Sequence, residues 1–472
     1  MKEHYNARYV WLLTTVAALG GLLFGYDFVV IGGAKPFYEK FFRLATEGQV
    51  GWANSCALLG CLLGSLVAGA AADRFGRKKL MVASAVLFAV SSVLTGWAPA
   101  FTAFVIWRIA GGVAIGIASN VSPVYIAEIS PAPWRGRMVS MNQMTIVVGI
   151  LAAQIVNWLI AEAVPAGATA DMIRQSWNGQ FGWRWMFTAV AGPSLIFLIG
   201  ALLVPESPRW LAVRGQKDRA RRTLARIGGE DYAAGALADV LATVEPYAGE
   251  ARWKELLAPG MLRVLGIGVF LAVLQQWCGI NVIFNYAEEI YRNAGYGVSD
   301  ILVNIVITGS INLLFTFVAL GFVDRLGRRS LMLAGCAGVG TCHFLLGLAY
   351  HFGLKGVPVL VCTLATIACF AMTLGPVAWV LISEIFPNRV RGAAVSVSVS
   401  ALWIACFALT FTFPSLNAAL GSTGTFWLYA GICLAGFVFV WRCVAETKGK
   451  TLEQIEARYN LGGSCRSMPS QS

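Results

Sequence analysis

The sequence predicts an all-α membrane protein of twelve transmembrane helices, arranged as two pseudo-symmetric six-helix bundles. Three observations predict it: a strongly apolar composition, apolar runs long enough to span a membrane, and charged segments that recur in the two halves of the chain. Hydrophobic residues make up 57% of the 472 residues, charged residues only 13%, and the mean hydropathy is +0.68. A chain with so little polar surface needs lipid, rather than water, around most of it.

The apolar runs are of membrane-spanning length. A hydrocarbon layer roughly 30 Å thick needs about 20 residues of helix. The runs lack the two-residue alternation of barrel strands, so helices are the structure that satisfies their backbone in lipid. We place the spans near 9–31, 50–72, 79–99, 101–128, 138–163, 183–204, 262–292, 299–323, 329–351, 356–382, 391–417 and 424–444.

Two charged segments between the spans occur twice. Asp73-Arg-Phe-Gly-Arg-Lys recurs as Asp324-Arg-Leu-Gly-Arg-Arg, and Glu128-Ile-Ser-Pro-Ala-Pro-Trp-Arg-Gly recurs as Glu384-Ile-Phe-Pro-Asn-Arg-Val-Arg-Gly. A substrate path at the interface between such repeats is the usual arrangement in carriers. We therefore expect an N-terminal bundle over 1–204, a cytoplasmic linker with short amphipathic helices over 205–261, a C-terminal bundle over 262–445 and a cytoplasmic tail over 446–472.

The basic residues predict the orientation of the chain. The net charge is +12, and most Lys and Arg residues follow even-numbered spans or lie in the linker and the two ends. The positive-inside rule assigns these segments to the cytoplasm, together with both termini. The charge then anchors topology rather than binding nucleic acid. The first span carries Asp27 and lacks a cleavage site, so we expect a retained helix, followed by a short outer loop over 32–49.

No cofactor, metal site or enzymatic centre is expected. Ten of the eleven Cys residues, from Cys56 to Cys443, lie in or at the edge of apolar spans, which indicates small core residues rather than a disulfide framework. No CxxC or His-rich spacing is present, and the three His residues form no constellation with Ser and Asp. The lipid bilayer is the partner that the composition predicts, and we expect the chain to act as a monomer.

Asp27 in span one and Arg108 in span four are charges at membrane depth. Such charges cost several kcal/mol and are by default paired or functional. At 1.5 Å per residue, both lie in the outer part of the membrane and differ in depth by roughly 5 Å, so they can pair. The pair is either structural or a proton site. Burial raises the pKa of a carboxyl while a nearby Arg lowers it, and a conformational change can alter that balance.

Side-chain amides form a second group of polar residues within the spans: Gln143, Gln275, Gln276, Asn281, Asn285 and Asn312. Amides both donate and accept, as sugar hydroxyls do, although they also join helices to one another. Gln143, Gln154 and Asn157 share one helical face, which predicts a stripe that faces water or substrate. Gln276 and Asn281 converge only if span seven bends at Gly279, and Gly375-Pro376 predicts a similar break in span ten, one turn before Trp379.

Six motifs in order resemble the sugar porter family of the major facilitators. They are Gly69-x3-Asp73-Arg-Phe-Gly-Arg-Lys, Tyr125-Ile-Ala-Glu-Ile-Ser-Pro-x3-Arg-Gly, Pro205-Glu-Ser-Pro-Arg-Trp-Leu, Gln275-Gln-x2-Gly-Ile-Asn, Ser383-Glu-Ile-Phe-Pro-x3-Arg-Gly and Glu446-Thr-Lys-Gly-Lys. In its first span the chain resembles bacterial proton-linked xylose and hexose symporters more than passive glucose facilitators. The resemblance implies the major facilitator fold, a bacterial inner membrane and proton-coupled uptake of a pentose or hexose by alternating access.

The resemblance also implies roles for single residues. Asp27 would take up the proton and Arg108 would pair with it. The residues that match sugar-contacting positions are Gln143, Gln275, Gln276, Asn281, Asn312 and Trp379. A cytoplasmic latch between the halves, formed when the carrier is open outward, would comprise Asp73, Arg77, Glu128, Arg135, Glu206, Asp324, Arg328, Glu384, Arg391 and Glu446. Topology anchoring and helix capping are the alternative roles of this last group.

The chain departs from the family pattern at three positions. Asn285 replaces one of two gating aromatics, and Leu402 and Ile150 stand where xylose carriers have amides or can have them. A pocket with fewer hydrogen-bonding groups leaves the identity of the sugar open. The alternatives to a symporter are a passive sugar uniporter, a proton-driven antiporter of another small solute and a non-transporting sugar sensor. The antiporter signature is absent from span five, where this chain has Gly149-Ile-Leu-Ala-Ala-Gln.

Overall fold

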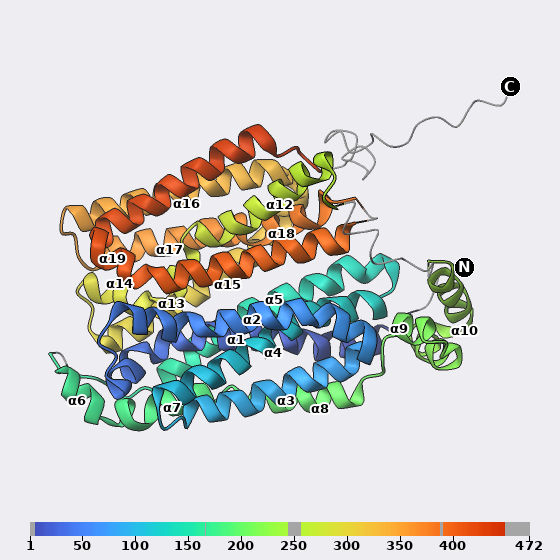
Figure 1. The fold of residues 1–472 in the computed structure, drawn as a ribbon, viewed down its shortest axis with the longest axis horizontal. Coiled ribbons are helices and arrows are strands. Elements are labelled where there is room, and N and C mark those ends of the chain that lie inside the picture. The colour runs from blue at the N-terminus through green and yellow to red at the C-terminus, as the bar shows by residue number, and fades with distance from the viewer. Residues whose placement is uncertain (1–4, 166, 244–255, 388–389, 449–472) are drawn as a thin grey trace.

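The computed structural model describes residues 5–165, 167–243, 256–387 and 390–448, and all regular structure in these ranges is helical. Figure 1 shows two bundles lying side by side with their helices roughly parallel. The first bundle contains α1 (Ala7–Phe42), α2 (Glu47–Phe75), α3 (Arg77–Gly96), α4 (Phe101–Ile129), α5 (Arg135–Ile160), α6 (Ala170–Gln175), α7 (Trp183–Thr188) and α8 (Ala191–Leu203). The second contains α12 (Pro259–Trp277), α13 (Ile280–Asn285), α14 (Ala287–Asn293), α15 (Val298–Leu326), α16 (Arg328–His351), α17 (Val357–Met372), α18 (Leu374–Glu384) and α19 (Arg391–Cys443).

The helices confirm the all-α membrane fold that the apolar runs predict. Within the described ranges, eleven stretches are long and apolar enough to cross a membrane. One of them, α19, contains two predicted spans. Gly421, between these spans, leaves helical geometry with φ 64° and ψ 171°, so α19 consists of two helices joined at a kink. The bundles meet along α2 and α19 and along α5 and α15, while α1 also contacts α13 and α14.

Two helices that reach the space between the bundles are broken, as the glycine and proline positions predict. Gly279 adopts φ +89°, a conformation that costs glycine little, and separates α12 from α13. Thr373 separates α17 from α18 with φ −132° and ψ −89°. This break comes before Gly375 rather than at it, since Pro376 lies in the first turn of α18, where no intrahelical donor is needed.

The prediction of an outer loop over 32–49 is wrong. Helix α1 continues through Pro36 to Phe42, and α2 begins at Glu47 after a capping box made by Thr46 and Gln49. Residues 32–39 are buried in protein rather than exposed to lipid or water. They pack against helices of both bundles, since Tyr38 stacks on Phe104 of α4 while Lys35 pairs with Glu288 of α14. Hydropathy separates lipid from water but does not detect polar residues that are buried in protein, so it ended the span too early.

Two further helices, α9 (Pro208–Val213) and α10 (Lys217–Thr243), lie between the bundles in sequence and beyond the end of the first bundle in space (Figure 1). Helix α10 is broken at Gly229, where φ is 85°. The start of α1 touches it, because the backbone N–H of Asn6 donates to the Ile227 carbonyl at 2.7 Å. The beginning of the described chain therefore lies at the same end of the molecule as the linker helices.

Candidate functional site

A cavity of about 160 Å³ lies between the two bundles and is lined by residues of both. All six residues that we predict to contact substrate line it: Gln143, Gln275, Gln276, Asn281, Asn312 and Trp379. Gln143 comes from the first bundle and the other five from the second. Phe24, Phe28 and Trp403 add aromatic surface. The structure thus joins amides and rings in one space, as recognition of a polar ring compound requires.

The amides of α12 and α13 are hydrogen-bonded to one another across the helix break. Gln275 Nε2 donates to the Gly375 carbonyl at 3.1 Å, and Gln276 Nε2 donates to Gln275 Oε1 at 2.9 Å. Asn281 Nδ2 donates to Gln276 Oε1 from the far side of the break. This chain of bonds fixes the orientation of each amide and connects broken helix α12–α13 to broken helix α17–α18.

The predicted polar stripe on α5 does not face one water-filled or substrate-filled space. Gln143 lines the cavity, but Gln154 and Asn157 are each only 1% exposed. Asn157 Nδ2 donates to the Val30 carbonyl of α1 at 2.9 Å, and Gln154 packs against Gly309 of α15. Shared helical spacing places three amides on one face, but it does not say which neighbouring helix covers each of them, so this prediction is wrong for two of the three.

The three departures from the family pattern occupy different surroundings. Ile150 and Leu402 line the cavity, so its walls carry aliphatic groups at these two positions. Asn285 is 2% exposed and lies outside the cavity lining, packed close to Gly32 of α1. The neighbouring Tyr286 hydroxyl donates to the Thr410 carbonyl at 2.6 Å, which ties this part of α13 to α19.

Asp27 and Arg108 form a buried ion pair, at 4% and 3% exposure, as their depths predict. Arg108 Nη1 lies 3.0 Å from Asp27 Oδ1, and the guanidinium also lies 5.4 Å from the Phe187 ring centroid. Asp27 Oδ2 has no hydrogen-bond partner within the described ranges. One carboxylate oxygen therefore holds the cation, while the other makes no hydrogen bond in the described part of the chain.

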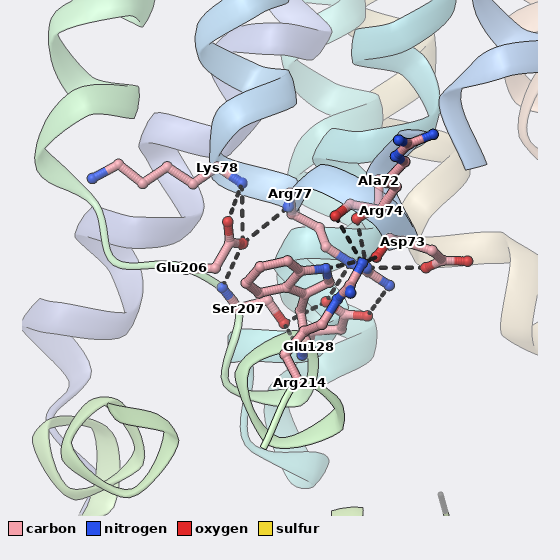
Figure 2. A network of polar contacts seen from close by, with 10 residues as sticks. Ala72, Asp73, Arg74, Arg77, Lys78, Glu128, Glu206, Ser207 and Arg214 are labelled. Atoms are coloured by element: carbon pink, nitrogen blue, oxygen red, sulfur yellow. Dashed lines mark hydrogen bonds and ion pairs between the residues drawn. The ribbon is translucent and has the colours of Figure 1, made fainter. Parts of the chain in front are cut away.

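Figure 2 shows four of the five predicted latch residues of the first bundle lying together: Asp73, Arg77, Glu128 and Glu206. Nε and Nη2 of Arg77 each lie 3.0 Å from an oxygen of Glu128, and Nη1 lies 3.0 Å from Asp73 Oδ1. Glu206 accepts the backbone N–H groups of Arg77 at 2.9 Å and of Lys78 at 3.1 Å. These are the first residues of α3, so Glu206 caps a helix N-terminus, where a negative charge is favourable.

The second bundle repeats this arrangement. Arg328 Nη2 lies 3.4 Å from Glu384 Oε1, and Glu446 accepts the backbone N–H groups of Arg328 at 2.9 Å and of Arg329 at 3.1 Å. Burial raises the pKa of Glu446, but hydrogen bonds from backbone amides outweigh that effect and leave the pKa lowered. The side chain of Asp324 lies outside the described residues.

Arg135 and Arg391 correspond in the repeat, and among the described residues both bind backbone carbonyls rather than acids. Arg135 Nε donates to the Ala127 carbonyl at 3.1 Å and Arg391 Nε to the Phe386 carbonyl at 3.2 Å. Among the described residues, each of these latch contacts thus stays within one bundle. In this conformation the contacts cap helices and close the ends of each bundle.

A cluster of charges around the buried Lys35, which the sequence analysis missed, joins the two bundles. Lys35 of α1 is 2% exposed, and its Nζ lies 3.1 Å from Glu288 and 3.7 Å from Glu289 of α14, and 3.3 Å from Glu39 of its own helix. Arg292 binds the other Glu288 oxygen at 2.8 Å. We call these five residues the outer ion cluster. Two features of the sequence could have predicted this cluster. They are the i, i+4 spacing of Lys35 and Glu39 and the adjacent acidic residues shortly after Tyr286.

Comparisons with known proteins agree with this geometry. The family model of sugar (and other) transporters matches residues 13–459. The D-xylose-proton symporter of Escherichia coli K12 is 38% identical, with 97% of each chain covered. The glucose transport protein of Synechocystis is 40% identical, with 95% of this chain and 97% of that protein covered. The inward-open structure of the xylose transporter XylE from E. coli has a TM-score of 0.84 at 36% identity, covering 95% of this chain and 100% of that chain.

The match extends over nearly the whole chain, includes both bundles and holds at the level of sequence and of structure. The chain is a multi-pass membrane transporter rather than an enzyme, and it belongs to the sugar (and other) transporter family, the sugar porters of the major facilitator superfamily.

Proposed function

We propose that this protein takes up a monosaccharide together with a proton by alternating access. The observation that carries the proposal is the buried Asp27–Arg108 ion pair in the first bundle. This bundle and the second bundle together line the amide-rich cavity. A passive carrier needs the cavity but has no use for a protonatable acid at this depth. The names of the xylose-proton symporter and the glucose transport protein support a pentose or a hexose as the substrate.

The amides and rings of the cavity would bind the sugar. Each hydroxyl can donate to an amide oxygen and accept from an amide N–H, while Trp379 offers an indole face to the C–H side of the ring. Gln143 would contact the sugar from the first bundle, and Gln275, Gln276, Asn281 and Asn312 from the second. A sugar held from both sides lowers the free energy of the state in which the bundles close on it.

Asp27 would couple the proton to this movement. The ionised carboxylate holds Arg108, and protonation at Asp27 Oδ2 cancels the charge that Arg108 requires. The guanidinium is then free to take another partner, so the packing between α1 and α4 differs between the protonated and deprotonated states. Because α1 also lines the cavity through Phe24 and Phe28, this change reaches the sugar site directly.

The outer ion cluster would act as the outer gate. It links α1 to α14 across the two bundles, whereas the described cytoplasmic contacts stay within each bundle. When the outside opens, the predicted latch residues would exchange these contacts for contacts between the two bundles. They are Asp73, Arg77, Glu128, Arg135, Glu206, Asp324, Arg328, Glu384, Arg391 and Glu446. The likeness to an inward-open relative supports this assignment of the conformation.

We further propose a bacterial inner membrane location, with both termini in the cytoplasm and a monomeric carrier. The division into bundles at 1–204 and 262–445, a linker over 205–261 and a tail over 446–472 is part of the same proposal. The start of α1, the linker helices and Glu446 lie among basic residues that the positive-inside rule assigns to the cytoplasm.

Counterflow of labelled sugars in proteoliposomes tests the proposal. D-xylose, D-glucose, L-arabinose and myo-inositol are supplied with and without an imposed pH gradient. We expect exchange of at least one sugar without a gradient and its accumulation with the outside acidic. Exchange without accumulation would indicate a uniporter, accumulation with the opposite gradient would indicate an antiporter, and no exchange would contradict sugar transport.

Leu402 offers a test of the cavity's specificity. Leu402→Gln adds an amide beside Trp403, whose indole N–H has no partner within the described part of the chain. We expect the affinity for D-xylose to rise about three- to tenfold, the effect of one net hydrogen bond. Leu402→Met, which changes shape but adds no donor, is the control in the same binding assay. Equal affinities of the Gln and Met variants would contradict a direct contact with the sugar.

A further inference from the structure

His343 of α16 lies behind the break that separates α12 from α13. Its side chain is fully buried, and Nε2 lies 2.8 Å from the carbonyl oxygen of Cys278. Cys278 directly follows α12 and precedes Gly279. Carbonyls at the end of a helix lack an intrahelical partner, and lipid offers none in its place. His343 supplies a donor for one of them.

The ring is held in one orientation. A carbonyl only accepts, so Nε2 must carry the proton that it donates to Cys278. The ring stacks on Phe426 with centroids 5.7 Å apart and lies 5.8 Å from the Tyr429 ring. A Cβ at position 279 would lie 2.9 Å from His343 Nε2, closer than side chains tolerate, so the break and the histidine fit together only with glycine.

The opposite side of the same break faces the cavity. There the Asn281 amide donates to Gln276, the Gln276 amide donates to Gln275, and the Gln275 amide donates to the Gly375 carbonyl. We propose that His343 is a positioning residue for the substrate site: by bonding Cys278, it sets the angle between α12 and α13 at which Gln276 and Asn281 present their amides together. The inference rests on the proposed sugar-binding role of these amides.

Binding and transport by two replacements test this role. His343→Met fills a similar length with an apolar side chain that has no donor, and His343→Gln keeps an N–H near the position of Nε2. We expect His343→Met to weaken binding of labelled D-xylose or D-glucose to purified protein at least about tenfold. The KM for counterflow should rise with little change in the maximal rate, whereas His343→Gln should stay within about threefold of the parent.

Two comparisons separate positioning from a general loss of packing. His351→Gln, at the exposed end of the same helix, should leave binding unchanged. In an Asn281→Ala background, His343→Met should have little further effect, because the pair that it aligns is already broken. Parent-like binding by His343→Met, equal weakening by the Met and Gln variants, or full additivity with Asn281→Ala would each overturn the inference. A parent protein that binds none of D-xylose, D-glucose, L-arabinose and myo-inositol would overturn the proposed function, and this inference with it.

Discussion

Lys35→Met is expected to shift the resting carrier toward an outward-open state. The substitution leaves Glu39, Glu288 and Glu289 without the ammonium that lies among them. Removing one partner of a buried ion pair destabilises by about 3–5 kcal/mol, and the lower end applies here because Arg292 still binds Glu288. Opening the outer side hydrates these carboxylates, so the conformational equilibrium should move roughly 100-fold.

Spin labels on the outer ends of the two bundles would measure this shift. Gly48 of α2 and Lys355, in the segment between α16 and α17, are both exposed. Labels at Gly48→Cys and Lys355→Cys, in a background without other accessible cysteines, should move apart in Lys35→Met. Electron–electron double resonance resolves such a change in distance.

Two controls identify the cause of the shift. Lys40→Met removes a neighbouring lysine of α1 that forms no ion pair within the described part of the chain, and it should leave the distance unchanged. Adding Glu288→Gln to Lys35→Met should restore part of the closed population, because removing both partners costs less than removing one. The outer ion cluster would not be a gate if Lys35→Met left the distance distribution as it is, or if Lys40→Met changed it equally.

The sequence analysis predicts the fold because lipid imposes a simple rule, that about 20 apolar residues make one spanning helix. The rule applied from Tyr9 to Ile31 but ended span one too early, since Lys35 and Glu39 are buried in protein rather than in lipid. Helix breaks were easier to predict. Gly279 was singled out because Gln276 and Asn281 could not otherwise share a side, and its left-handed conformation confirms that reasoning.

The candidate site was predictable to the extent that its residues lie in motifs. Gln275, Gln276 and Asn281 occur in one such motif, and the cavity brings them together with Gln143. His343 had no motif, and an isolated histidine in an apolar helix does not reveal which carbonyl it will meet. The contacts of Gln154 with α15 and of Lys35 with α14 depend on how the two bundles pack against each other. The helical periodicity of the sequence does not predict this packing.

Asp27→Asn is expected to abolish accumulation of sugar against a gradient while leaving sugar exchange intact. Asparagine has the same shape and still offers a carbonyl oxygen to Arg108, but it does not titrate. One pH unit supplies about 1.4 kcal/mol per proton and 100 mV supplies about 2.3 kcal/mol, which together allow roughly 500-fold accumulation at one proton per sugar. The ratio in the variant should fall to about 1.

Proteoliposomes with an acidic exterior and an imposed potential provide the measurement. The parent should accumulate sugar, and it should lose this accumulation when the pH difference and the membrane potential are both set to zero. Asp27→Asn should show no accumulation under either condition. Counterflow, which needs no net proton movement, should proceed in both proteins. Asp171→Asn makes the same chemical change at an exposed site and should match the parent. Equal loss of counterflow and accumulation in Asp27→Asn would make the Asp27–Arg108 pair a structural element, and retained accumulation would place the coupling acid elsewhere in the chain.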